Sequence, residues 1–252
     1  MFSANCRPKP LVLKFGGALL GQQGGVERAA ACVQRERAGQ PGAGVVVVVS
    51  ALGATTDRLF DEAARRFGDD EAAVADHVSS GEEEAAQRMV AALEGLGAPV
   101  LACSPECLQL VTTGSLLDGE PESVNVAGLH EELYPPGGEP SVVVTMGFVA
   151  LDGAGRRSLL GRGGSDLTAL FVAHHLDACD CVLLKDVDGI HESDPKGTEP
   201  GAPARLDEVA LQDLERFGGR VLQSKAARFA ARAGRPFSLG SPERPGLRTR
   251  VR

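Results

Sequence analysis

The chain has 252 residues, 32 glycines, one tyrosine, no tryptophan and a formal net charge of −8. A chain of this length suits one large α/β domain or two small ones, and folding can bury roughly three quarters of its surface. The acidic charge and the scarcity of aromatic rings exclude nucleic acid as an expected partner, because a phosphate backbone needs a basic face. The longest apolar block is far too short to span a bilayer, so no membrane partner is expected.

Short apolar runs alternate with helical stretches, which is the pattern of a mostly parallel sheet covered by helices on both faces. The run of five valines that ends at Val49 is typical of a buried central strand. The segment FVALDGAGRRSLLG predicts a β-hairpin with DGAG at its turn. We expect strands at 11–15, 45–50, 99–102, 141–145 and 181–185, and helices at 26–38, 56–67, 81–96, 165–176, 206–217 and 221–233.

The cysteines and histidines give no sign of a metal centre. The six cysteines lack C-x-x-C spacing and a histidine at metal-finger distance, which favours reduced thiols in a cytoplasmic protein over a disulfide framework. Cys179 and Cys181 are predicted to be small core residues, and His174 and His175 to be half-buried helix residues. No residue is therefore assigned as a metal ligand, and the amino terminus has no signal-length apolar run.

The first glycine motif is LKFGG, near the amino terminus. Lys14 lies at the end of a predicted strand, and Gly16 and Gly17 let the backbone approach a phosphate without a Cβ clash. The alternative is a lysine that only precedes an ordinary glycine turn.

The second motif, GRGGSD, places Gly163 and Gly164 in a turn before a helix that begins near Ser165. The amide donors of that helix start could face an anion. Arg162 could hold a carboxylate with both of its terminal nitrogens, and Asp166 could orient the lysine of the first motif or a metal ion. Alternatively, Ser165 and Asp166 only cap the helix.

The third motif, KDVDGIHESDPK, joins a strand end to turn residues and fits a loop around a nucleotide. It lacks the alternating acids and closing glutamate of a calcium loop. Together the three motifs provide the cations, amide donors and acid that phosphoryl transfer requires.

The order and spacing of these motifs resemble the amino-acid kinase family, and within it most closely the catalytic domain of aspartokinase. The segments VSALGATTDRL, SSGEEEAAQRM and FGGRVLQSKA extend the resemblance, so that it covers residues from about 11 to about 251. It implies a three-layer α/β/α sandwich of the amino-acid kinase and carbamate kinase type, with a mostly parallel central sheet. One domain over 1–252 would have an acceptor-binding lobe up to about residue 155 and a nucleotide-binding lobe from about 156.

The resemblance also implies ATP and Mg²⁺ as cofactors, a homo-oligomer such as a dimer, and phosphorylation of the side-chain carboxylate of L-aspartate to 4-phospho-L-aspartate. Glu82 would meet the amino group of the acceptor; alternatively it is an acid favoured by the dipole at a helix start. Arg220 stands where the family carries a phosphate-contacting lysine, and Lys196 where it often has arginine, unless Lys196 is a surface lysine without a role. The implied catalytic residues are Lys14 and Asp166; the acceptor residues are Ser50, Thr55, Glu82, Arg162 and Ser165; the nucleotide residues are Gly16, Gly17, Gly163, Gly164, Lys185, Asp186, His191, Lys196 and Arg220.

Departures from the family pattern keep other readings open. Ala18 and Leu19 replace the Thr-Ser pair typical of aspartokinases, and Lys185 stands where threonine or serine is common. Glutamate, acetylglutamate, uridylate or a specialised small acid are alternative acceptors, and a catalytically weak regulatory or binding subunit is a non-enzymatic alternative. No segment resembling an ACT domain follows before Arg252, so we expect regulation either to come from a separate subunit or to be absent.

Overall fold

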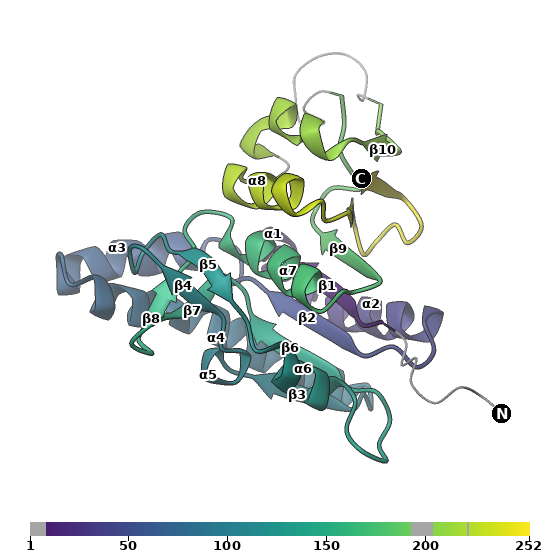
Figure 1. Cartoon of the computed structure of the whole chain (residues 1–252), viewed down its shortest axis with the longest axis horizontal. Coiled ribbons are helices and arrows are strands. Elements are labelled where there is room, and N and C mark those ends of the chain that lie inside the picture. Colours follow the sequence, from purple (N-terminus) through teal and green to yellow (C-terminus); the bar gives the residue numbers. More distant parts are fainter. Residues whose placement is uncertain (1–8, 193–203, 221) are drawn as a thin grey trace.

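The computed structural model describes residues 9–192, 204–220 and 222–252, and for residues 218–220 it describes the backbone alone. Its centre is an eight-stranded sheet in the order β10-β12-β11-β9-β1-β2-β6-β3, parallel throughout except between β11 and β12 (Figure 1). The strands are β1 Leu11–Phe15, β2 Val45–Val49, β3 Val100–Cys103, β6 Val142–Met146, β9 Asp180–Leu184, β10 Glu208–Val209, β11 Phe237–Gly240 and β12 Arg248–Val251. The predicted mostly parallel α/β fold is confirmed.

Helices cover both faces of this sheet. Successive side chains of β1 and β2 point to opposite faces, because a strand has a period of two residues. One face packs on α2 Gly25–Gly39 and α4 Glu71–Gly95, and the other on α6 Val126–Leu133, α7 Gly164–His175 and α8 Ser224–Ala233. The valines of β2 are fully buried and divide between the two cores, as expected for a central strand. The result is a three-layer sandwich.

A smaller sheet, in the order β5-β4-β7-β8, lies beside α3 Thr55–Phe67 (Figure 1). Its strands are β4 Val111–Thr113, β5 Glu120–Ser123, β7 Val149–Asp152 and β8 Arg157–Leu159. The antiparallel pair β7–β8 is the predicted hairpin, with its turn at DGAG. The remaining elements are α1 Gly17–Leu20, α5 Pro105–Leu108 and the 3₁₀ helix η1 Leu211–Arg220.

Several sequence predictions were wrong in detail. Helix α4 begins at Glu71, ten residues before the predicted start, because Asp70 caps it by accepting a hydrogen bond from the Ala73 N–H at 3.1 Å. Glu82 therefore lies in mid-helix and is not a helix-start acid. The expected helix at 206–217 is instead β10 followed by η1, and the next helix begins at Ser224.

The observed burial of Cys179 and of the two histidines also differs from the prediction. Cys181 is fully buried in the core as predicted, but Cys179 is exposed just before β9 begins. His174 and His175 end α7 on the exposed side of the helix, not half-buried. Among the residues that the structure describes, no helix combines the length and the apolar character needed to cross a membrane.

Candidate active site

The site forms where the carboxyl ends of β1, β2 and β9 meet, the usual place for a ligand in an open parallel sheet. Lys14 on β1 pairs in register with Leu183 of β9. Lys185 lies two residues beyond Leu183, and residues two apart in an extended strand share a face. Both lysines therefore lie on the face covered by α7, although one belongs to the start of the chain and the other to its last third.

Asp166 joins these two lysines. Its Oδ1 lies 2.7 Å from the Lys14 Nζ, and its Oδ2 accepts a hydrogen bond from the Lys185 Nζ at 2.8 Å. The side chains of Lys14, Asp166 and Lys185 are 7%, 5% and 19% exposed. One buried carboxylate is thus shared by two ammonium groups.

The pKa values of this trio follow from burial and from the close charges. Burial alone would raise the pKa of Asp166, but Lys14 and Lys185 outweigh it and lower the value to about 2. Burial lowers the pKa of Lys14, Asp166 opposes that change, and the nearby charge of Lys185 adds to it. Asp166 is therefore ionised at neutral pH.

The GRGGSD turn places Asp166 in the first turn of α7. The N-cap of α7 is Gly163, which has φ +74° and makes no side-chain capping bond. A Cβ on Gly163 would overlap the Gln223 side chain, so glycine is required for conformation and for space. The alternative that Ser165 and Asp166 only cap the helix is therefore wrong, because Asp166 binds the lysines.

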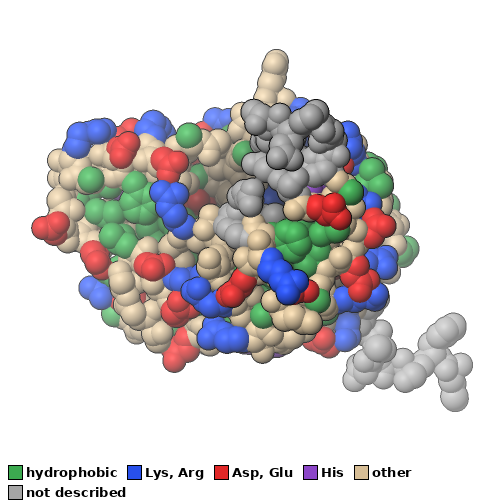
Figure 2. Space-filling model, turned by 90° about the horizontal axis from the view of Figure 1, so that it is seen from above, with side chains coloured by type: hydrophobic (Ala, Val, Ile, Leu, Met, Phe, Trp, Pro, Cys, Tyr) green, Lys and Arg blue, Asp and Glu red, His purple; other side chains and the backbone are tan. Residues whose placement is uncertain are grey.

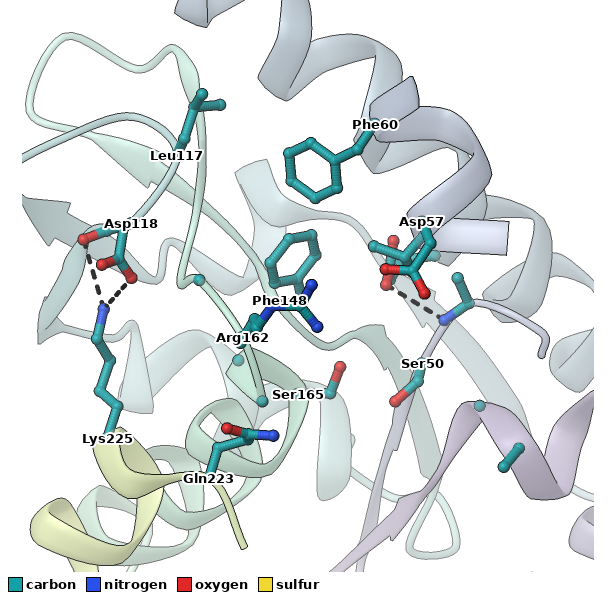
Figure 3. Close-up of a pocket in the computed structure, with 18 of the residues that line it drawn as sticks. Ser50, Asp57, Phe60, Leu117, Asp118, Phe148, Arg162, Ser165, Gln223 and Lys225 are labelled. Carbon is teal, nitrogen blue, oxygen red and sulfur yellow. Dashed lines mark hydrogen bonds and ion pairs between the residues drawn. The ribbon is translucent and has the colours of Figure 1, made fainter. Parts of the chain in front are cut away.

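A cleft of about 820 Å³ opens in front of Lys14. The surface is hollowed there beside a group of hydrophobic side chains near the α3 end of the molecule (Figure 2). Figure 3 shows Ser50 on one side of the cleft, Arg162 and Ser165 near its middle, and Gln223 and Lys225 on the side of α8. The cleft therefore lies between segments from the first and the last parts of the chain.

Glu82 lines the same cleft from α4. It is 2% exposed, and its Oε1 accepts a hydrogen bond from the Ala51 N–H at 3.2 Å. The other oxygen, Oε2, is buried and has no hydrogen-bond partner among the described residues. Burial raises the pKa of Glu82 to about 7, although the Ala51 N–H bond works against the rise. A buried carboxylate oxygen without a hydrogen-bond partner is suited to a cationic or hydrogen-bonding group of a ligand.

The structure gathers most of the predicted site residues, but not all. The cleft is lined by the predicted residues Lys14, Gly17, Ser50, Glu82, Arg162, Gly163, Gly164 and Ser165. Asp166 and Lys185 lie outside this lining and are reached through Lys14. Gly16 adjoins both lysines, since a Cβ there would lie 3.8 Å from the Lys14 Nζ and from the Lys185 Cγ.

Other predicted residues lie away from the cleft lining. Thr55 is not among the lining residues, whereas the next residue, Thr56, is. His191 contacts Asp188, with 2.8 Å between Nε2 and Oδ1, and Asp186 likewise lies outside the lining. Lys196 and the side chain of Arg220 lie outside the described part of the chain.

Sequence reasoning missed several lining residues. Phe60 and Phe148 meet edge to face with ring centroids 6.4 Å apart, and Leu117 lies on the same wall. Lys225, at the start of α8, places its Nζ 2.6 Å from the Asp118 Oδ1 (Figure 3). Phe148 begins the hairpin motif and Lys225 lies in QSKA, so both were in segments already noted, but no local pattern signals that they face a cleft. The full set of missed residues is Ala18, Ala51, Gly53, Thr56, Asp57, Phe60, Leu117, Asp118, Phe148, Gly161, Gln223, Ser224 and Lys225.

Lys14 and Lys185 lie at the carboxyl ends of neighbouring parallel strands, beside a glycine turn and a helix N-terminus, and in an α/β protein this arrangement is suited to an anion. The model of the amino acid kinase family matches residues 9–240, and the chain belongs to that family.

Relatives and solved structures agree with this assignment. The chain is 30% identical to an aspartate kinase of Pseudomonas fluorescens over 235 residues, which cover 91% of this chain and 55% of that protein. The crystal structure of aspartate kinase from Synechocystis has a TM-score of 0.79 at 27% identity, over 96% of this chain and 39% of that one. Aspartokinase III of E. coli, in complex with aspartate and ADP, has a TM-score of 0.77 at 23% identity, over 96% and 65%. The chain spans about half the length of the curated relatives it matches.

Proposed function

We propose that the protein transfers the γ-phosphoryl group of ATP to the side-chain carboxylate of L-aspartate, giving 4-phospho-L-aspartate and ADP. The observation that carries the proposal is that Lys14, held by Asp166, and the buried Glu82 line the same cleft. Lys14 offers positive charge to the phosphates, and Glu82 offers a carboxylate to the amino group of an amino acid. The aspartokinase relatives support aspartate as that amino acid.

Phosphoryl transfer requires little covalent chemistry from the protein. The acceptor carboxylate is already ionised at neutral pH, so it attacks the γ-phosphorus without a general base. Lys14 stabilises the negative charge on the phosphoryl oxygens in the transition state. Arg162 and Ser165, near the middle of the cleft, would hold the α-carboxylate of the acceptor, and the amides at the start of α7 would face phosphate oxygens.

Magnesium would enter as part of the MgATP substrate. The described residues contain no group of three or more acidic, histidine or cysteine side chains placed to hold a metal ion. Both oxygens of Asp166 already contact ammonium groups. Mg²⁺ commonly keeps most of its ligands from phosphates and water, which agrees with this arrangement.

The same proposal includes an acceptor lobe up to about residue 155, a nucleotide lobe from about 156, a cytoplasmic location and a homo-oligomer such as a dimer. Light scattering of the purified chain, with and without candidate amino acids, tests the oligomer.

The test of the reaction is acyl-phosphate formation, trapped as hydroxamate, with ADP release followed in parallel. Aspartate, glutamate, acetylglutamate and uridylate are offered separately. Hydroxamate with aspartate alone supports the proposal. ADP release with uridylate and no hydroxamate would refute it in favour of a nucleotide kinase. No signal with any of the four acceptors, while ATP still binds, would favour a different acceptor or a binding or regulatory subunit.

A second candidate keeps the fold and changes the acceptor. Ala18 lines the cleft where aspartokinases typically carry a hydroxyl, and Phe60, Leu117 and Phe148 form an apolar wall. An acid with an apolar portion would fit this wall better than aspartate does. The same assay with such acids decides between the two candidates.

A further inference from the structure

Lys185 contacts the same carboxylate as Lys14 but lies on its other side. Lys14 lines the cleft, whereas Lys185 lies outside the lining and holds the opposite oxygen of Asp166. The two ammonium groups therefore have different surroundings: one faces the space that a ligand would fill, and the other lies behind the carboxylate.

A carboxylate with a single buried partner holds that partner strongly, because removing the partner leaves a buried charge without compensation. Asp166 differs from that case, since Lys185 remains on Oδ2 at 2.8 Å if the Lys14 ammonium moves toward a phosphate. Lys185 also repels Lys14 and so weakens the hold of Asp166 on it. Both effects make Lys14 easier to release.

We propose that Lys185 is a positioning residue that compensates Asp166 and thereby frees Lys14 to bind the nucleotide phosphates. The inference rests on the nucleotide binding by Lys14 in the proposed function, and adds a role that acts through Asp166 instead of through contact with ATP. Within the described part of the chain, the charged groups that act on Lys14 are Asp166 from α7, Lys185 after β9 and Glu82 from α4. Of these, Lys185 is the only like charge, and its nearness lowers the pKa of Lys14 beyond the effect of burial.

The test compares Lys185→Met, which keeps most of the side-chain length and removes the charge, with Lys185→Arg, which keeps the charge. The pH dependence of Lys14 acetylation by acetic anhydride, read by peptide mass spectrometry, reports the Lys14 proton. Calorimetric titration with ADP reports phosphate binding. Lys9→Met is the matched control, because Lys9 also pairs with an aspartate, Asp177, at 2.6 Å but on the surface.

In Lys185→Met we expect the midpoint of Lys14 acetylation to rise by about one pH unit and the Kd for ADP to rise about tenfold. Lys185→Arg and Lys9→Met should stay within about threefold of the wild type for ADP, with an unchanged midpoint. Should Lys185→Met fold poorly, Lys185→Thr replaces it with the residue type common at this position in aspartokinases.

Weaker ADP binding with an unchanged Lys14 midpoint would overturn the proposal, because Lys185 would then contact the nucleotide itself. A raised midpoint with unchanged ADP binding would also overturn it, as would no change in either quantity. Neither measurement uses an acceptor. Failure of the aspartate assay with these results intact would therefore reject the proposed function while leaving the role of Lys185 in place.

Discussion

Replacing Glu82 by glutamine should make the protein relatively more stable at high pH. Glu82 is buried, and its pKa rises from an ordinary 4.5 to about 7 because burial disfavours the charged form. The rise corresponds to about 3 kcal/mol of folding free energy at about 1.36 kcal/mol per pKa unit. Glutamine has nearly the same shape and no charge, so it removes this term.

The sign follows from proton linkage. Between pH 4.5 and about 7 the folded state holds a proton on Glu82 that the unfolded state has lost. Wild-type stability therefore falls across this window, and the full penalty is present above pH 7. A cost for burying the glutamine NH₂ without a partner is independent of pH and cancels when two pH values are compared.

The assay is urea unfolding of wild type and Glu82→Gln at pH 5 and pH 8. The stability of the variant relative to wild type should rise by about 2.5 kcal/mol from pH 5 to pH 8, because a small part of the penalty is already present at pH 5. A difference that does not change with pH would refute the reasoning, since Glu82 would then titrate normally in the folded protein. The same variant should show a higher KM for aspartate, because its side chain no longer offers a carboxylate to the amino group.

Three further predictions concern the lysines and the glycine turn. Lys14→Ala should lower the rate of ADP release with acceptor present by about a hundredfold or more, and an unchanged rate would remove Lys14 from the mechanism. Gly16→Ala should fold normally, because the added methyl makes only ordinary van der Waals contacts, but it should bind ADP more weakly because that methyl lies beside the Lys14 ammonium. Gly17→Ala should instead lose about 1–3 kcal/mol of unfolding free energy in urea, because its Cβ would overlap the Ala51 carbonyl oxygen. Equal stability of the two glycine variants would contradict this distinction. Lys225→Ala should cost about 1–3 kcal/mol in thermal unfolding, since its ammonium contacts three backbone carbonyl oxygens and the carboxylates of Asp118 and Glu120, and an unchanged Tm would show that these contacts contribute nothing.

The central strands could be predicted from local sequence. Strands β1, β2 and β9 are short apolar runs buried on both faces. Such a run can be recognised in the sequence without knowing which strands lie beside it. The start of α4 was missed because residues 71–80 mix helix formers with Val, His and Ser, so that the signal for the start lay in the Asp70 cap. A Cβ on Gly81 would lie 3.0 Å from Ala51 and Leu59, so this glycine serves close packing inside the helix and does not mark its beginning.

The features of the site also divide into those that local sequence predicts and those that depend on packing. The sequence by itself determined the family and the parallel α/β sheet, because glycine turns and buried runs are local features. Only the tertiary structure decided that Lys14 and Lys185 share Asp166, that Glu82 is buried with one oxygen unpartnered, and that Phe60 and Phe148 form one wall. The physical reason is that these pairings depend on strand register and on the packing of α4 and α7, which bring together residues far apart in the chain.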